Sequence, residues 1–454
     1  VLGNHKYGDL SPYILKSDNR GRSWKSIRNN LPDRTLVWRI VQDHIKESLM
    51  FAATEFGIYF TINSGDDWVK LSGGVPTISF RDLAIQKREN DLVGASFGRG
   101  IYILDDYSAL RDVSEKALNK EATLFDTRDA LRYIPRYESR ERLGSHYYSA
   151  PNPDFGAVFT YHLRDGLKTQ IQTRQTAEQA TREGGQDTPF PGWDIIADEM
   201  SEADPSIWII IKDKQGNVVR RVRGPVKQGI NRVAWDLRYP APYALNSNSR
   251  LRSPGKEPAG FLAAAGTYSA TLVKEVHGEF TTLQEGRKFN VVQMNEGALN
   301  GNSNSDTSSF LRSYEAALGH FSAVSNSLEA ALSNVEAMKV AASRSQSSTG
   351  NIDQRLNGLR ESLLKLEDNV FGNRAKRSIG EKIKPNIEGR LFSIELGISE
   401  STYGPTATNH KSLKIVNDEL QNITARLKAL NVDAKLISDD LVKAGAPWVE
   451  GSSL

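Results

Sequence analysis

The C-terminal third of the chain carries apolar residues at helical spacing. Four stripes, Tyr314 to Met338, Ile352 to Val370, Ile379 to Ile398 and Leu413 to Leu430, place an apolar side chain at every third or fourth position. This period gives each helix one apolar face, and short connections between such helices are typical of an up-and-down bundle. We expect no inward-facing histidine or Glu-x-x-His motif in the stripes, so we interpret them as packed core rather than as a cofactor or partner groove. We predict a helical bundle over residues 307–445.

In the middle of the chain, apolar residues recur at a shorter spacing than in the helical stripes. Short runs rich in β-branched and aromatic residues are separated by turn signals, as β-strands are. The runs lie at 156–163, 206–213, 217–224, 230–237, 266–274 and 287–293. They predict an Ig-like β-sandwich over 144–293. Two polar stretches interrupt it: an insertion at 164–204, expected to be partly helical, and a turn-rich, exposed loop at 241–260. Either stretch could contact a partner or be a solvated loop.

The first hundred residues repeat a short apolar strand that leads into a polar turn. The first turn holds Ser17, Asn19, Gly21, Ser23 and Trp24, and the second holds Thr61, Asn63, Gly65, Asp67 and Trp68, an offset of 44 residues. In this frame the asparagine can accept hydrogen bonds from its own loop, and the glycine supplies a positive φ at no steric cost. The hydroxyl ties the loop ends together. We expect both tryptophans to fold beneath their hairpins as buried hydrophobic plugs.

A third copy of the strand extends the repeat. "GRGIYILDD" at 98–106 aligns with "EFGIYFTIN" at 55–63, an offset of 43, but no tryptophan follows it. Such a period matches a propeller blade of about 40–45 residues, so residues 1–108 are predicted to be the last blades of a β-propeller. About two and a half blades cannot close a ring of four to eight. We therefore expect the C-terminal piece of a longer chain, or blades supplied by another polypeptide.

The turn frame resembles the Asp-box (BNR) repeat of sialidases, sortilin-like propellers and xyloglucanase-like glycoside hydrolases. Both copies carry Asn where that family usually has Asp. "GASFGRGIYILDD" is similar to the last-blade signature of large exported bacterial proteins of the sortilin-like, glycosyl-hydrolase-like type. "GINRVAWDLRY" and "AGTYSATLVKE" resemble an FlgD-type Ig-like module. The resemblance implies export to the periplasm, the cell surface or the extracellular space of a Gram-negative bacterium.

The predicted fold class is therefore multidomain and mainly β plus α. A connector at 109–143 joins the propeller blades to the sandwich, a linker at 294–306 joins the sandwich to the helices, and a tail follows at 446–454.

The composition of the chain excludes several kinds of partner and binding site. The 454 residues include 58 basic and 55 acidic side chains, with a net charge of +3 and no block of like charge, so a nucleic acid partner is not expected. The absence of cysteine excludes disulfides and cysteine-ligated metal sites. The longest apolar runs fall far short of the ~20 residues of a membrane helix. We predict a protein that does not span a membrane and has no cofactor or metal.

Candidate chemistry is sparse. No His-x-His, His-Glu-x-x-His or Gly-x-Ser-x-Gly motif is present. A glycosidase needs two carboxylates across a cleft, and adjacent residues on a strand point to opposite faces. Asp105 and Asp106 are therefore weak candidates for a catalytic acid, and Arg99 is a weak candidate for holding an anion on the propeller face.

Two function classes remain. We expect a non-catalytic, exported binding or scaffold protein that acts through its propeller and Ig-like surfaces. Its partner would be another protein or the upstream part of the same chain, and a polysaccharide ligand is possible. The alternative is a glycoside hydrolase whose active site lies on upstream blades.

Overall fold

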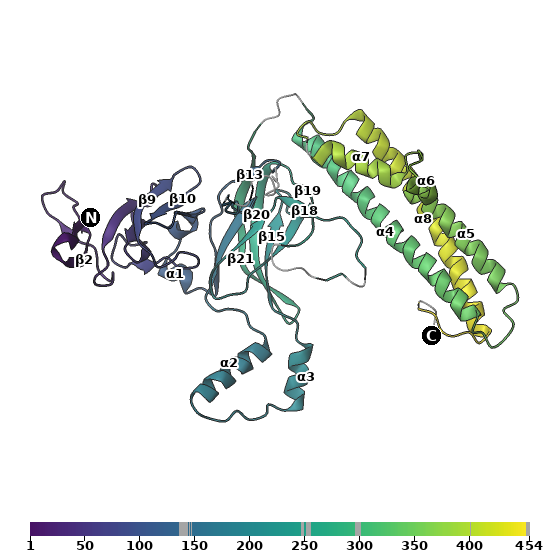
Figure 1. Ribbon diagram of the computed structural model, residues 1–454, viewed down its shortest axis with the longest axis horizontal. Coiled ribbons are helices and arrows are strands. Elements are labelled where there is room, and N and C mark those ends of the chain that lie inside the picture. The colour runs from purple at the N-terminus through teal and green to yellow at the C-terminus, as the bar shows by residue number, and fades with distance from the viewer. Residues whose placement is uncertain are drawn as a thin grey trace. The chain divides into compact units, whose positions relative to one another are not determined.

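The structure is a computed structural model (Figure 1). It describes residues 1–135, 144, 146, 148–246, 249–250, 256–295, 301–399 and 401–450, without the side chain of residue 304. Parts of the predicted connector, exposed loop, linker and tail lie outside the described residues. The fold is mainly β with a helical C-terminal region. It divides into two compact units: residues 1–131, 137–236 and 266–292 form the first, and 132–136, 237–265 and 293–454 form the second.

Small antiparallel sheets begin the first unit. Two pairs come first, β1 (Leu2–Asn4) with β2 (Asp9–Tyr13), and β3 (Leu15–Lys16) with β4 (Lys25–Ser26). A four-stranded meander follows, with β5 (Val37–Gln42), β6 (Met50–Thr54), β7 (Gly57–Thr61) and β8 (Val69–Lys70). A three-stranded sheet contains β9 (Phe80–Gln86), β10 (Asp91–Ser96) and β11 (Ile101–Leu104).

Within the β5–β8 sheet, strand β6 is buried on both faces. Met50 and Ala52 pack with Ile14 and Ile27 on one side, whereas Phe51 on the other side joins the core of the β9–β11 sheet. Successive strand residues point to opposite faces, so burial of both faces requires the continuous apolar run seen in β6. A 3-10 helix, η2 (Tyr107–Arg111), and α1 (Glu115–Leu118) follow β11.

Two further sheets pack face to face. One contains β12 (Ala122–Leu124), β14 (Ala157–Leu163) and β17 (Gly229–Trp235). The other contains β13 (Ala130–Arg132), β21 (Glu279–Gln293), β20 (Gly266–Val276), β15 (Ser206–Lys212) and β16 (Val218–Gly224) in that order. Buried rings join the two layers: Phe159 meets Phe289 edge to face, and Trp235 meets Tyr268.

A helix pair leaves this double sheet between β14 and β15. It consists of α2 (Gln170–Glu183) and α3 (Trp193–Ser201), and both extend away from the strands in Figure 1. Thr169 starts α2 with a capping box, because its hydroxyl accepts from the Gln172 N–H and the Gln172 side chain accepts from the Thr169 N–H.

Helices dominate the second unit. They are α4 (Asn304–Ala342), α5 (Ile352–Phe371), α6 (Arg374–Ser378), α7 (Ile387–Ser399) and α8 (Ala407–Lys443). The predicted stripes meet in one apolar core, with Tyr314, Leu366 and Leu420 fully buried. The third stripe is shorter than expected, because Ile379 is exposed at the end of α6 and α7 begins only at Ile387. Pro385 intervenes, and proline disfavours a helical conformation of the residue before it.

The segment Leu237–Ala265 belongs to this second unit, although the sequence placed it inside the sandwich, with an exposed loop at 241–260. It forms the ribbon β18 (Arg238–Pro240) and β19 (Ala259–Leu262). The Phe261 N–H donates to the Glu315 carboxylate of α4 at 2.8 Å, and the Arg312 guanidinium lies 3.2 Å from the centre of the Tyr239 ring. A methyl group on Gly260 would lie 2.4 Å from Glu315 Oε1, so the ribbon approaches α4 this closely only with glycine there.

Candidate functional site

Both turn frames close through the same hydrogen bonds. In the first, the Gly21 N–H donates to Ser17 Oγ (2.7 Å) and the Ser23 N–H to Asn19 Oδ1 (2.9 Å). In the second, the Gly65 N–H donates to Thr61 Oγ1 (2.9 Å) and the Asp67 N–H to Asn63 Oδ1 (3.0 Å). The glycines have φ of +86° and +94°, a region that favours glycine. Apart from the two tryptophans, the residues of the two frames thus make matching local networks.

The asparagine amides act as hydrogen-bond donors within their frames, a role that an ionised aspartate cannot have. Asn19 Nδ2 donates to Ser23 Oγ at 2.8 Å, and Asn63 Nδ2 donates to the Asp67 carboxylate at 3.0 Å. A carboxylate cannot donate when ionised. In the second frame, an aspartate at position 63 would also place its negative charge beside that of Asp67.

The two tryptophans differ, and the expectation that both are buried is wrong for one. Trp68 is 4 % exposed and its indole N–H donates to the Ile27 carbonyl at 2.8 Å. Asn30 brackets the Trp68 backbone with two further hydrogen bonds. Trp24 is 61 % exposed. The cover of the Trp68 ring comes from Ile27, 41 residues earlier in the chain, and not from its own turn frame.

The three weak ligand candidates lie in different local environments. Arg99 lies exposed in the turn between β10 and β11. The Asp106 carboxylate caps η2 by accepting from the Ser108 N–H and lies 3.6 Å from the Arg128 guanidinium. The Asp105 carbonyl accepts from Arg232 at 2.8 Å. Burial, together with the nearby Asp91, raises the pKa of the Asp105 carboxyl.

A cation–aromatic cluster joins Trp38 of β5, Arg81 of β9 and Phe97, which follows β10. The Arg81 guanidinium lies 3.8 Å from the Trp38 ring centre and 4.9 Å from that of Phe97. Trp38 donates its indole N–H to Glu55 at 2.9 Å, and Ser79 donates to the same oxygen at 3.0 Å. The sequence prediction chose Arg99 in this region, whereas Arg81 makes the ring contacts.

On α3 the usual pattern of burial is reversed: a charged side chain is buried and large apolar side chains are exposed. Glu199 is buried at 6 % exposure, whereas Trp193 is 76 % exposed and Met200 is 83 % exposed. At 100° per residue, Trp193, Ile196 and Met200 share one face of the helix. Phe190, 62 % exposed, meets Trp193 edge to face at 5.1 Å. We call Phe190, Trp193, Ile196 and Met200 the α3 apolar face.

An ion pair fixes this orientation. Arg174 of α2 donates from Nε and Nη2 to the two Glu199 oxygens, both at 2.7 Å, and from Nη1 to Glu178 at 2.7 Å. The hydrogen bonds from Arg174 lower the pKa of Glu199. A planar guanidinium that binds a carboxylate through two parallel bonds is the most directional of protein ion pairs. The charged side of α3 is thereby held against α2, and its apolar side is left outward.

The stretch of sequence that contains the α3 apolar face is acidic. No lysine or arginine occurs between Arg182 and Lys212, whereas seven acidic residues do: Glu183, Asp187, Asp194, Asp198, Glu199, Glu202 and Asp204. Asp194 and Asp198 lie on α3 itself, about 100° and 140° around the helix from Trp193. The sequence prediction of a polar, partly helical insertion did not anticipate this exposed apolar face.

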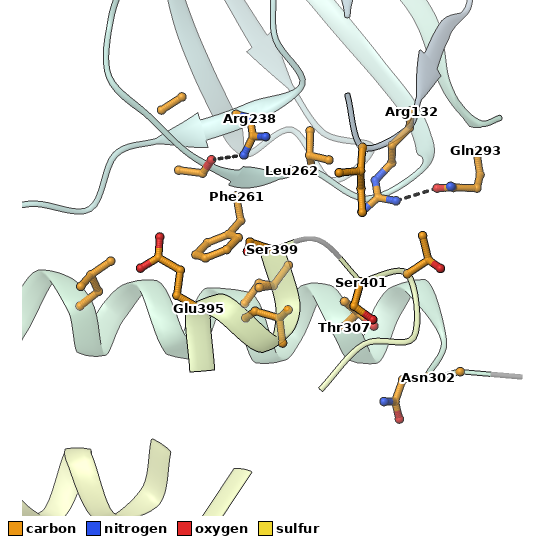
Figure 2. A pocket seen from close by; sticks show the side chains of 18 of the residues that line it. Arg132, Arg238, Phe261, Leu262, Gln293, Asn302, Thr307, Glu395, Ser399 and Ser401 are labelled. Atoms are coloured by element: carbon orange, nitrogen blue, oxygen red, sulfur yellow. Dashed lines mark hydrogen bonds between the residues drawn. The ribbon is translucent and has the colours of Figure 1, made fainter. Parts of the chain in front are cut away.

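The second unit contains a cavity of about 460 Å³ between the β18–β19 ribbon and helices α4 and α7. In Figure 2, Arg238, Phe261, Leu262, Arg132 and Gln293 line one side, opposite Glu395, Ser399, Ser401 and Thr307. Arg132 donates to the Ala263 carbonyl (2.8 Å) and to Gln293 Oε1 (2.6 Å), and Arg238 donates to the Gly260 carbonyl (3.0 Å). Both guanidinium groups are therefore held in place.

The described part of the chain shows neither a cluster of metal-ligating side chains nor a membrane-spanning helix. Its His, Asp and Glu side chains form no group of three or more that could hold a metal ion. No helix within it is long and apolar enough to cross a membrane.

Comparison with known proteins adds little. No protein-family model matches the sequence, and no curated protein matches it. One solved structure, the extracellular domain of a one-component system from B. thetaiotaomicron, aligns with a TM-score of 0.18 and 11 % identity. The alignment covers 62 % of this chain and 28 % of that one.

Proposed function

We propose that this chain is a non-catalytic, exported binding protein that docks a partner protein on the α3 apolar face. The observation that carries the proposal is the inverted burial of α3, in which the carboxylate of Glu199 is inside and the ring of Trp193 is outside. Contiguous exposed apolar side chains with a polar rim are typical of interaction sites, and Trp is enriched among residues that dominate binding energy.

The charge around this face defines the partner. Asp194 and Asp198 flank the apolar stripe, and no basic residue lies between Arg182 and Lys212. Opposite potentials across an interface increase the association rate and exclude partners of like charge. The partner segment therefore combines apolar side chains with Lys or Arg, and a bilayer of anionic lipid is repelled.

The rest of the first unit acts as a rigid support. We interpret the β5–β8 meander as a propeller blade, because it has four antiparallel strands and its turn frame recurs at an offset of 44 residues. The double sheet that carries α2 and α3 we interpret as an Ig-like module. These interpretations, together with export, rest on the resemblance to Asp-box proteins.

A glycoside hydrolase is the second candidate. The observation that favours it is the raised pKa of Asp105, a property of general acids in glycosidases. A polysaccharide panel tests it: we expect no hydrolysis by the chain, and hydrolysis that Asp105→Asn abolishes would replace the binding proposal with the enzymatic one.

Calorimetric titration tests the docking proposal. The probe is a synthetic amphipathic peptide of lysine and leucine at helical spacing, and its matched control replaces each lysine with glutamate. We expect the lysine peptide to bind, more weakly at higher salt, and the glutamate peptide not to bind. Trp193→Ala should weaken binding at least about tenfold, or about 1.4 kcal/mol.

Trp24→Ala is the control variant, since it removes an exposed indole far from α3 in sequence. Equal binding of both peptides, equal loss in Trp24→Ala and Trp193→Ala, or binding to vesicles of phosphatidylglycerol would each refute docking on the α3 apolar face.

A further inference from the structure

The cavity of the second unit has the composition of a ligand site. Its volume of about 460 Å³ falls within the roughly 300–1,000 Å³ typical of small-molecule pockets. Its walls come from the β18–β19 ribbon, from the start of α4 and from the end of α7, all within one compact unit. Such a cavity does not require another chain for its shape.

We infer that this cavity binds a small polyhydroxylated carboxylate, the chemistry of a sugar acid. Three features of the lining indicate this class: two fixed guanidinium groups, a wall of hydroxyl and amide groups, and one aromatic ring. Each corresponds to a different part of such a ligand.

The guanidinium groups correspond to the carboxylate. Arg132 and Arg238 outnumber the carboxylate of Glu395 on the lining, so its formal charge is positive. Their hydrogen bonds to backbone carbonyls and to Gln293 orient the two planar groups before a ligand arrives. A planar guanidinium has five N–H donors in a geometry that matches a carboxylate, and a preorganised group loses less entropy on binding.

The opposite wall corresponds to sugar hydroxyls. Thr307, Ser399 and Ser401 face the arginines across the cavity in Figure 2, and a hydroxyl both donates and accepts hydrogen bonds. The Glu395 carboxylate accepts from the Tyr314 hydroxyl at 3.4 Å, and its two oxygens have further lone pairs that can accept from neighbouring hydroxyls of a sugar ring. The lining also holds Asn302, which can donate and accept.

The ring of Phe261 corresponds to the C–H face of the sugar. It packs edge to face on Tyr314 at 5.4 Å, and its backbone N–H is bonded to Glu315. These contacts fix the ring between the arginine side and Glu395. A ligand that is charged at one end and has an apolar face along its ring meets complementary groups in both places.

Titration calorimetry of the full chain with sodium D-glucuronate tests the inference. D-glucose, which lacks the carboxylate, and acetate, which lacks the ring, are the matched probes. We expect saturable binding of glucuronate and at least tenfold weaker binding of glucose and acetate. Arg238→Gln should abolish glucuronate binding, whereas Arg22→Gln, the same change in an exposed turn, should leave it unchanged.

A second variant tests whether binding is lost in Arg238→Gln only because that variant fails to fold. Ser399→Leu keeps both arginines but fills part of the cavity, and it should also weaken glucuronate binding at least tenfold with an unchanged circular dichroism spectrum. No saturable binding of glucuronate, equal binding of glucose, or undiminished binding by Ser399→Leu would overturn the inference. None of these outcomes bears on docking at α3, which lies in the other unit.

Discussion

Replacing Trp68 with alanine should destabilise the N-terminal sheets, whereas the same change at Trp24 should not. Trp68 is 4 % exposed, packs in the core with Ile14, Ile27 and Tyr59, and donates its indole N–H to the Ile27 carbonyl. Truncating a buried tryptophan costs about 3–5 kcal/mol, and the Ile27 carbonyl that loses its donor adds to that cost. Trp24 is 61 % exposed, and changes on a surface usually stay within about 0.5 kcal/mol.

Hydrogen exchange of backbone amides is the appropriate assay, because a chain of several units does not unfold in two states. The amides of β6 and β7 report the opening of the sheet beneath Trp68. Their opening free energy should fall by about 3 kcal/mol or more in Trp68→Ala. An equal fall in Trp24→Ala, or no fall in Trp68→Ala, would refute the distinction between the two turn frames.

Two further predictions concern the same region. Asn63→Asp should cost about 1–2 kcal/mol in opening free energy, because it replaces a hydrogen bond to Asp67 with two like charges. Asn19→Asp should cost under about 0.5 kcal/mol, because the Ser23 hydroxyl can donate to the new carboxylate. Equal costs of the two changes would show that the charge of Asp67 is not the cause. Burial alone would raise the pKa of Asp43, but hydrogen bonds from Arg111, Tyr107 and two backbone N–H groups hold it well below its ordinary value. Asp43 therefore stabilises the fold above its unfolded pKa of about 3.8, and this contribution is lost as the pH falls below that value. Asp43→Asn should cost about 3–5 kcal/mol at neutral pH and flatten the acid dependence of thermal unfolding, and an unchanged acid profile would disprove the role of Asp43.

Local patterns in the sequence predicted local structure well. The helical stripes of the C-terminal region correspond to buried faces of α4, α5, α7 and α8. The residues of each turn frame hydrogen-bond only a few positions apart, so their geometry depends on little beyond their own spacing. Strand runs were equally local, since alternation and turn residues mark them.

What the sequence could not predict depends on distant partners. The ribbon at 237–265 packs on α4 through Glu315, more than fifty positions away, and no pattern within the ribbon indicates that contact. The exposure of Trp24 depends on which residues lie beside it in space. The orientation of α3 likewise depends on a distant residue. Its apolar stripe would ordinarily mark an inward face, and only the pairing of Glu199 with Arg174 reveals the opposite orientation. The cavity likewise collects residues from parts of the chain as distant as Arg132 and Thr402.

The most direct test of docking on the α3 apolar face is hydrogen exchange of the full chain with and without the lysine–leucine peptide. We expect slower exchange confined to residues 188–203, and no such slowing in a variant carrying both Asp194→Lys and Asp198→Lys. Slowing that leaves residues 188–203 unaffected, or that persists unchanged in the charge-reversed variant, would refute docking on the α3 apolar face.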